Sequence, residues 1–277
     1  MRRFFALAAL AIAALAPCFA FAGQSRLESI DTTIAGTGTT YLDLARAFVP
    51  DLAADGMNWK GRTFDAEFAG RFELDENWPD GLEIGGVETL ALDRAGTKAL
   101  AVLYDFGTLS NAPQGPAILA VYALEAEPRL VGSVDVGLDR ETHFADPPLL
   151  DLGDGTTLLV ARSAHWNSSQ SYSITSLVLA TDDGLSPVDT ILTFSERLCG
   201  LNRTQEPVIS VDKTGEPPAL RVEVRMTEEK VEESCDTEPV PAVDRIVSTT
   251  YRLNEKGVYA PDSDALEVLA RENEKRF

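Results

Sequence analysis

The chain has 277 residues, of which 44% are hydrophobic, and this is enough apolar material for one sizeable core or two small ones. It carries 44 acidic residues against 24 Lys and Arg, which gives a formal net charge of −20 at pH 7. A surface this negative repels nucleic-acid phosphates and anionic lipid head groups, so it argues against both as partners.

Residues 1–22 have the three parts of a cleavable signal peptide. Two arginines at the start precede an apolar stretch over residues 4–16, and residues 20–22 (AFA) supply the small side chains that signal peptidase needs. Cleavage is therefore expected before Gly23. We expect an exported mature protein, periplasmic or extracellular, with no segment inserted in a membrane.

An uncleaved membrane anchor is the alternative, because residues 4–22 carry no charge and approach the length that spans a bilayer. This run is rich in alanine, which drives insertion weakly, and Pro17 interrupts it. A lipoprotein signal ending at Cys18 is a further alternative, but proline stands where a small residue is expected before the cysteine. General secretion is the favoured interpretation.

Cys199 and Cys235 remain once Cys18 has left with the leader. An even pair in an oxidising compartment predicts a disulfide. The chain-entropy model assigns about 4 kcal/mol to closing a loop of this length. The alternatives are two buried free thiols or a redox pair, although redox pairs are usually close in sequence.

The first predicted element of the mature chain is a short amphipathic helix within residues 41–52, ended by Pro50. Turn signals follow, in which a hydrogen-bond acceptor stands first and glycine fourth, as a type I turn with a left-handed glycine requires. A looser variant occupies residues 151–155. The four regular segments are residues 93–96, 181–184, 212–215 and 254–257.

Strands are predicted between these turns. Residues 220–226 alternate between apolar and charged side chains, which is typical of a strand with one buried face. Residues 99–103 and 158–161 are apolar on both faces, which predicts inner strands covered on both sides. The predicted fold class is all-β: antiparallel hairpins in a β-propeller-like array, with a large β-sandwich as the alternative.

A C-terminal helix is predicted over residues 262–277, with Asp262 or Ser263 as its N-cap and an apolar stripe along one face. The expected organisation is therefore a cleaved leader (1–22), a single β-rich domain (23–261) and this helical tail.

The densest group of polar and aromatic side chains lies in residues 163–172. His165, Trp166, Asn167 and Tyr172 are the candidate binding residues, because tryptophan and tyrosine are effective recognition anchors. A polar surface loop without a ligand is one alternative. A serine nucleophile beside His165 is another, but the chain lacks the G-x-S-x-G sequence that holds such serines.

Asp151 and Asp154, followed by Gly155, are the candidate metal ligands. The stretch resembles a fragment of the Asp-rich calcium loops of integrin-type propeller repeats, in which oxygens at alternate positions surround one cation. The resemblance implies calcium as a cofactor. A turn without metal is nevertheless the favoured interpretation, since only two carboxylates are present and Leu152 breaks the alternation. No cofactor is therefore assigned, and calcium is the alternative.

No catalytic residue is assigned, because the sequence holds no recognisable catalytic motif. The leading hypothesis is an exported, acidic, non-catalytic β scaffold that binds a protein or small-ligand partner through its loops, with a protein of the cell envelope as one such partner. One alternative is a secreted or periplasmic hydrolase that uses acidic residues with calcium. Another is a structural component of the envelope.

Expression of the whole chain in a double-membraned bacterium should deliver to the periplasm a protein that begins at Gly23. Its Cys199 and Cys235 should react with an alkylating reagent only after reduction, because an oxidising compartment joins them. Peptide mass spectrometry reads both properties. An Ala22→Arg variant is the control and should keep its leader, since signal peptidase requires a small residue there. Two alkylatable thiols in the mature protein would contradict the disulfide.

Overall fold

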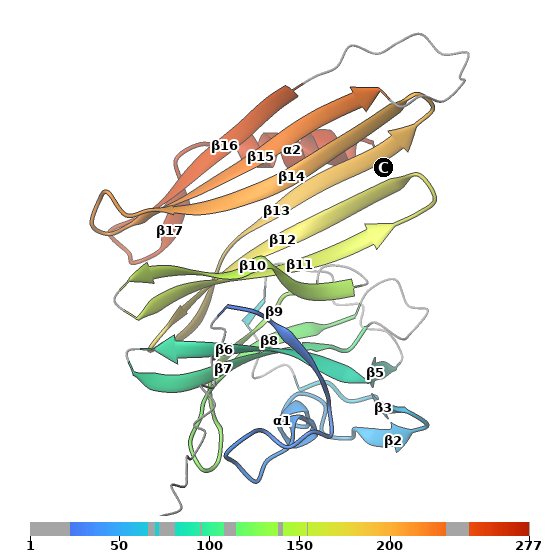
Figure 1. Cartoon of the computed structure of the whole chain (residues 1–277), viewed down its shortest axis with the longest axis vertical. Coiled ribbons are helices and arrows are strands. Elements are labelled where there is room, and N and C mark those ends of the chain that lie inside the picture. The colour runs from blue at the N-terminus through green and yellow to red at the C-terminus, as the bar shows by residue number, and fades with distance from the viewer. Residues whose placement is uncertain are drawn as a thin grey trace, which may run out of the picture.

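Strands make up most of the protein and belong to three open sheets, accompanied by the helices α1 (Tyr41–Ala45) and α2 (Ala265–Glu274) (Figure 1). The all-β prediction is confirmed. Neither of these described helices is long and apolar enough to cross a membrane. The computed structural model describes residues 23–65, 70–71, 81–94, 96–107, 115–137, 141–153, 155–230 and 244–276.

The first sheet has six strands in the order β1-β6-β7-β8-β9-β4, antiparallel except that β4 pairs in parallel with β9. A separate small sheet has the order β2-β3-β5. The strands of the first sheet are β1 (Arg26–Ser29), β4 (Gly70–Arg71), β6 (Gly86–Arg94), β7 (Thr97–Asp105), β8 (Ala117–Ala123) and β9 (Arg129–Asp135). Those of the small sheet are β2 (Ala53–Asp55), β3 (Asn58–Gly61) and β5 (Leu82–Ile84).

The second large sheet is an antiparallel meander of eight strands, ordered in space as along the chain (Figure 1). Propeller blades are typically sheets of four strands. Sheets of six, eight and three strands confirm neither the propeller-like array nor the large sandwich. The eight strands are β10 (Glu141–Gly153), β11 (Thr156–Trp166), β12 (Gln170–Thr181), β13 (Gly184–Leu198), β14 (Leu201–Asp212), β15 (Ala219–Lys230), β16 (Asp244–Leu253) and β17 (Tyr259–Pro261).

Each of the predicted turn segments connects two neighbouring strands. In the β6–β7 turn, Gly96 has a φ of +83° and donates its N–H to Oδ1 of Asp93 at 3.1 Å. In the β16–β17 turn, Gly257 has a φ of +74° and donates its N–H to the carbonyl oxygen of Asn254 at 3.0 Å. Glycine adopts this left-handed backbone without steric cost, so it sets where the strands reverse.

Three clusters of buried apolar side chains hold the layers together. The first core lies between the N-terminal segment that includes α1 and one face of β7 and β8. The second core lies between the opposite face of these strands and one face of β11 and β12. The third core covers the other face of β11 and β12 and also contains side chains of β15, β16, β17 and α2.

The inner strands are covered on both faces, as their sequences predict. In β7, Val102 belongs to the first core and Leu103 to the second. In β11, Leu159 belongs to the second core and Leu158 to the third. Residues 220–226 of β15 bury their apolar side chains, and their charged side chains lie on the other face.

A glycine permits the two large sheets to touch at one point. A Cβ atom added to Gly132 of β9 would lie 2.8 Å from the backbone nitrogen of Leu185 in β13 and 3.3 Å from Cα of Gly184. Backbone atoms cannot yield as a flexible side chain can, so this contact between β9 and β13 requires glycine.

The eight-stranded sheet splits between β13 and β14, which pair through only three residues on each strand. Asn273 of α2 bridges the strands beyond that point. Its amide donates to the carbonyl oxygen of Leu192 in β13 at 3.2 Å and exchanges two hydrogen bonds with Gln205 in β14, at 2.8 and 2.9 Å. Gln205 also accepts the N–H of Phe194. Side-chain amides thus replace the missing strand ladder.

The N-terminal helix is shorter than predicted. A capping box between Thr40 and Asp43 starts α1, which ends at Ala45 rather than at Pro50. The chain then turns so that Phe48 enters the first core. Burial of that ring takes precedence over continuation of the helix.

The predicted caps of the C-terminal helix are wrong, because α2 begins at Ala265. Oδ1 of Asp262 accepts the N–H of Thr250 at 2.9 Å, and the hydroxyls of Ser263 and Thr249 lie 3.0 Å apart. Both side chains therefore secure β16 instead of the helix. The division of the chain into leader, domain and tail stays a prediction.

Replacing Asn273 by alanine should lower the free energy of unfolding by about 2 kcal/mol, because the buried amide of Gln205 and the Leu192 carbonyl lose their partner. Chemical denaturation monitored by circular dichroism measures the change. Glu274→Ala is the matched control on the exposed side of the same helix and should stay within about 0.5 kcal/mol of the parent. Equal stabilities of the two variants would contradict the bridging role of Asn273.

Candidate functional site

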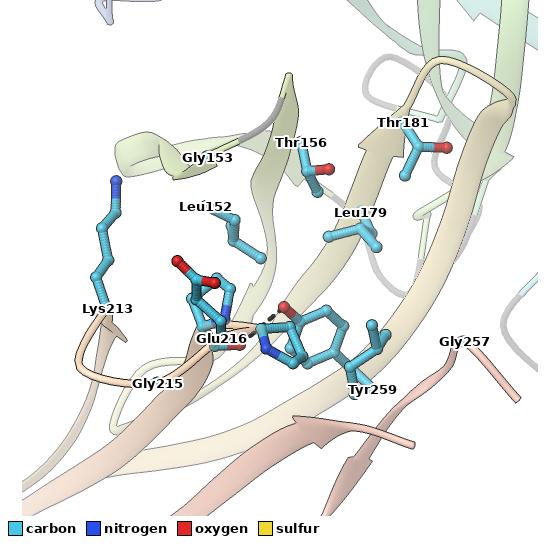
Figure 2. Close-up of a pocket in the computed structure, with 13 residues that line it drawn as sticks. Leu152, Gly153, Thr156, Leu179, Thr181, Lys213, Gly215, Glu216, Gly257 and Tyr259 are labelled. Carbon is cyan, nitrogen blue, oxygen red and sulfur yellow. Dashed lines mark hydrogen bonds between the residues drawn. The ribbon is translucent and has the colours of Figure 1, made fainter. Parts of the chain in front are cut away.

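A pocket of about 650 Å³ opens at one end of the eight-stranded sheet (Figure 2). The β10–β11, β14–β15 and β16–β17 turns and the neighbouring ends of β11 and β12 enclose it. It is lined by Leu152, Gly153, Thr156, Leu179, Thr181, Lys213, Gly215, Glu216, Pro217, Pro218, Leu253, Gly257 and Tyr259.

The pocket has apolar walls. Leu152 and Leu179 approach it from β10 and β12, and Tyr259 lies across from them (Figure 2). Each of these three side chains is at most 8% exposed and belongs to the third core. Pro217 and Pro218 add to the wall on the side of the β14–β15 turn. The pocket is therefore the open end of the third core.

A hydrogen bond ties two of the enclosing segments together. The hydroxyl of Tyr259 donates to the carbonyl oxygen of Pro218 at 2.9 Å, which connects β17 to the β14–β15 turn. Burial raises the pKa of this tyrosine, so the hydroxyl keeps its proton at neutral pH and remains a donor.

The mouth of the pocket carries charges of both signs. Nζ of Lys213 lies 2.9 Å from Oδ2 of Asp151, and this ion pair connects the β14–β15 turn to β10. Glu216 and the hydroxyls of Thr156 and Thr181 complete the polar rim (Figure 2). The ion pair is exposed, so it contributes at most about 1 kcal/mol to stability.

The chain matches no protein-family model, no curated protein and no solved structure. The interpretation of the pocket therefore depends on its own geometry.

Most of this site cannot be predicted from the sequence. Lys213 and Gly257 stand in predicted turns, but nothing in the sequence places those turns beside Leu179. The signal that points to the site is the cluster of Pro217 and Pro218 directly after a turn, because two prolines make an apolar surface without a backbone N–H.

The structure divides the predicted binding residues between two faces of the β11–β12 hairpin. Trp166 is 57% exposed, and with Asn167 it lines a shallow depression. His165 and Tyr172 are a cross-strand pair whose rings stack with centroids 5.1 Å apart. Neighbouring residues of a strand point to opposite faces, so the four side chains do not form one site.

The candidate metal ligands are described only in part, because Asp154 lies outside the described residues. The carboxylate of Asp151 is engaged by Lys213 and by the N–H of Gly153 at 2.9 Å. The hydrogen bond from Lys213 lowers the pKa of Asp151. In the part of the chain that the structure describes, no three His, Cys, Asp or Glu side chains are grouped to hold a metal ion.

The predicted cysteine pair is also described only in part. Cys199 is exposed in the two-residue turn between β13 and β14, and Cys235 lies outside the described residues. The disulfide between them stays a prediction.

The second histidine lies where the two large sheets meet. Nδ1 of His143 in β10 is 3.8 Å from Oε1 of Glu88 in β6, and Nε2 is 3.8 Å from Oε2 of Glu141. The other oxygen of Glu88 accepts the N–H of Phe144 at 2.6 Å. The interaction with Glu88 is the main cause that raises the pKa of His143, and the charges of Asp105 and Glu141 raise it further.

A raised pKa means that the folded state holds the proton of His143 more tightly than the unfolded chain does. Its contribution to stability is therefore complete below about pH 6.5 and is lost as the pH rises through the pKa of the folded protein. This contact contributes to the association of the sheets mainly in mildly acidic solution.

In a Glu88→Gln variant, the pKa of His143 should fall, because the main group that raises it has lost its charge. Proton NMR of the imidazole ring measures this directly, since the chain has only two histidines. The signals of His165 serve as the internal reference, and Glu125→Gln is the control for loss of an exposed charge. An unchanged titration of His143 in the Glu88→Gln variant would refute the assignment.

Proposed function

We propose that this chain is an exported, acidic, non-catalytic β scaffold that binds a ligand with an apolar part in the pocket at the end of the third core. The observation that carries the proposal is the continuity between pocket and core. Leu152, Leu179 and Tyr259 belong to the third core and also line the open pocket.

The size and chemistry of the pocket support a small ligand or a short peptide segment. Ligand sites commonly enclose about 300–1,000 Å³, with mostly apolar walls and a few polar groups that orient the ligand. The volume of about 650 Å³ lies in this range. Leucine, proline and tyrosine side chains offer contacts to an apolar body, and the rim offers hydroxyls and the Lys213–Asp151 pair to a polar end.

Charge narrows the ligand class further. Lys213, the one lysine among the described residues of the lining, is paired with Asp151, and Glu216 adds a negative charge at the mouth. The chain as a whole carries a net charge of −20. A neutral or cationic ligand is therefore favoured over an anionic one.

Two polar groups of the lining are already engaged within the protein. Lys213 is paired with the carboxylate of Asp151, and the Tyr259 hydroxyl donates to the Pro218 carbonyl. Both groups act as hydrogen-bond donors, whereas a nucleophile must give up its proton to a base, and this supports binding for these two groups.

The leader motivates the location that we propose, which is the periplasm or the outside of the cell, with a partner in the cell envelope. For the architecture, we favour the sandwich over the propeller. β7 and β8 of one large sheet share the second core with β11 and β12 of the other, as the two sheets of a sandwich share one core.

The pocket is tested with Nile red, a neutral apolar dye whose fluorescence rises in apolar surroundings. The mature protein should bind one dye molecule saturably. A Thr156→Trp variant should weaken that binding by about tenfold or more, because the new ring occupies space between the walls; tenfold corresponds to about 1.4 kcal/mol. Fluorescence titration measures the affinities.

Thr97→Trp is the matched control, because this exposed threonine lies at the start of β7, in the other large sheet. It should bind the dye as the parent does. Thermal melts of both variants establish that they are folded. Absence of saturable dye binding to the parent protein, or equal affinities of the two variants, would refute the proposed site.

A further inference from the structure

The opposite end of the eight-stranded sheet presents a second, chemically different surface. Trp166 ends β11 there, ten residues after Thr156 at the pocket, and its side chain is 57% exposed. Ten strand residues span about 33 Å. This surface is therefore too far from the pocket to share a small ligand with it.

Trp166 lies at the edge of a shallow depression of about 260 Å³ between the β11–β12 hairpin and β13–β14. Nearly all other lining side chains are neutral hydroxyls and amides: Asn167, Gln170, Ser171, Ser195 and Asn202 are examples. We call this the Trp166 surface. It combines a flat apolar ring with a set of short groups that both donate and accept hydrogen bonds.

The Trp166 surface is close to electrically neutral, in contrast to the chain as a whole. Glu196 is the acidic residue of its lining, and that carboxylate is only 8% exposed and forms ion pairs with Arg203 and Arg276. Arg197 adds one positive charge. These charges favour neither a strongly cationic nor a strongly anionic partner.

The hairpin that carries Trp166 is held in place before any ligand binds. Oδ1 of Asn167 accepts the N–H groups of Ser169 and Gln170 at 3.2 and 3.0 Å. The N–H of Arg197 donates to the carbonyl oxygen of Ser169 at 2.7 Å, which ties the hairpin tip to β13. A ligand therefore meets a pre-formed surface, and little affinity is lost to ordering it.

We propose that the Trp166 surface binds a neutral carbohydrate chain. The C–H groups on the face of a sugar ring match the apolar face of an indole, and the sugar hydroxyls match the serine, asparagine and glutamine side chains around it. Pockets for drug-sized molecules usually have a volume of at least about 300 Å³, and this depression is smaller. This suits surface contact with one or two sugar units of a chain that extends beyond it.

Nucleic acid and protein fit this surface less well. The net charge of the chain repels a phosphate backbone. Protein interfaces bury about 800 Å² on each partner, usually around an apolar centre, whereas Trp166 is the single large apolar side chain among the described residues of this lining.

The test uses the mature protein and three neutral tetrasaccharides: cellotetraose, maltotetraose and the tetramer of N-acetylglucosamine. The chain has three tryptophans, and the indole N–H signal of Trp166 is identified in a two-dimensional NMR spectrum by its loss in a Trp166→Phe variant. At least one tetrasaccharide should shift that signal saturably. Isothermal titration calorimetry, which does not depend on the Trp166 signal, measures the affinities of the variants: Trp166→Ala should weaken the binding of that tetrasaccharide by about tenfold, and Trp166→Phe should weaken it less.

Met57→Ala is the matched control, because Met57 is 96% exposed in the first half of the chain. It should bind the sugar as the parent does. Nile red binding should be the same in the Trp166→Ala variant, so failure of this proposal and failure of the proposed pocket are distinguishable. The proposal is overturned if no tetrasaccharide shifts the Trp166 signal at about 10 mM, or if Trp166→Ala binds as tightly as the parent. It is also overturned if a neutral Gly-Ser peptide or a tetragalacturonate shifts the same signal more strongly.

Discussion

The two large sheets lie against each other because β7 and β8 of one sheet and β11 and β12 of the other bury apolar side chains on both faces. Ala101 and Leu103 of β7 belong to the second core together with Leu159 and Ala161 of β11, and all four are at most 2% exposed. A fully buried leucine contributes about 1.5–3 kcal/mol relative to an exposed one. These strands cannot face water on either side, so the first and third cores must form on their outer faces.

The third core then decides where the molecule is open. α2 covers part of it with Leu266 and Leu269, and the amide pair of Asn273 and Gln205 closes the split between β13 and β14. In the part of the chain that the structure describes, the ends of β10, β12 and β17 are left open, and the pocket lies there. A ligand in this pocket would complete a core that the chain itself leaves unfinished.

The two surfaces that we assign to binding follow from the same meander. Long antiparallel strands bring their turns together at two opposite ends of a sheet. One end gathers prolines, leucines and Tyr259 around the pocket, and the other gathers Trp166 with hydroxyl and amide side chains. The body of the sheet separates the two surfaces.

Local patterns in the sequence determined the strands, the reversals between them and the two-sided burial of residues 99–103 and 158–161. These properties depend on neighbours along the chain: side chains alternate from face to face, and glycine alone adopts the left-handed backbone easily. The sequence also singled out Trp166 as a candidate for binding, and the structure places its side chain at the surface. The sequence did not show that His165 and Trp166 point to opposite faces of the hairpin. That follows only if β11 extends through both residues, and the end of a strand is not evident from the sequence.

The tertiary structure alone decided the sheet order, the extent of both helices and the pocket. The helix α1 ends before Phe48, and the ring of Phe48 is buried in the first core. Asp262 and Ser263 bind β16, so they do not cap α2. Lys213 and Asp151 are 62 residues apart in sequence and 2.9 Å apart in space. Contacts of this kind depend on which strands pair across the whole sheet, and no local pattern of side chains carries that information.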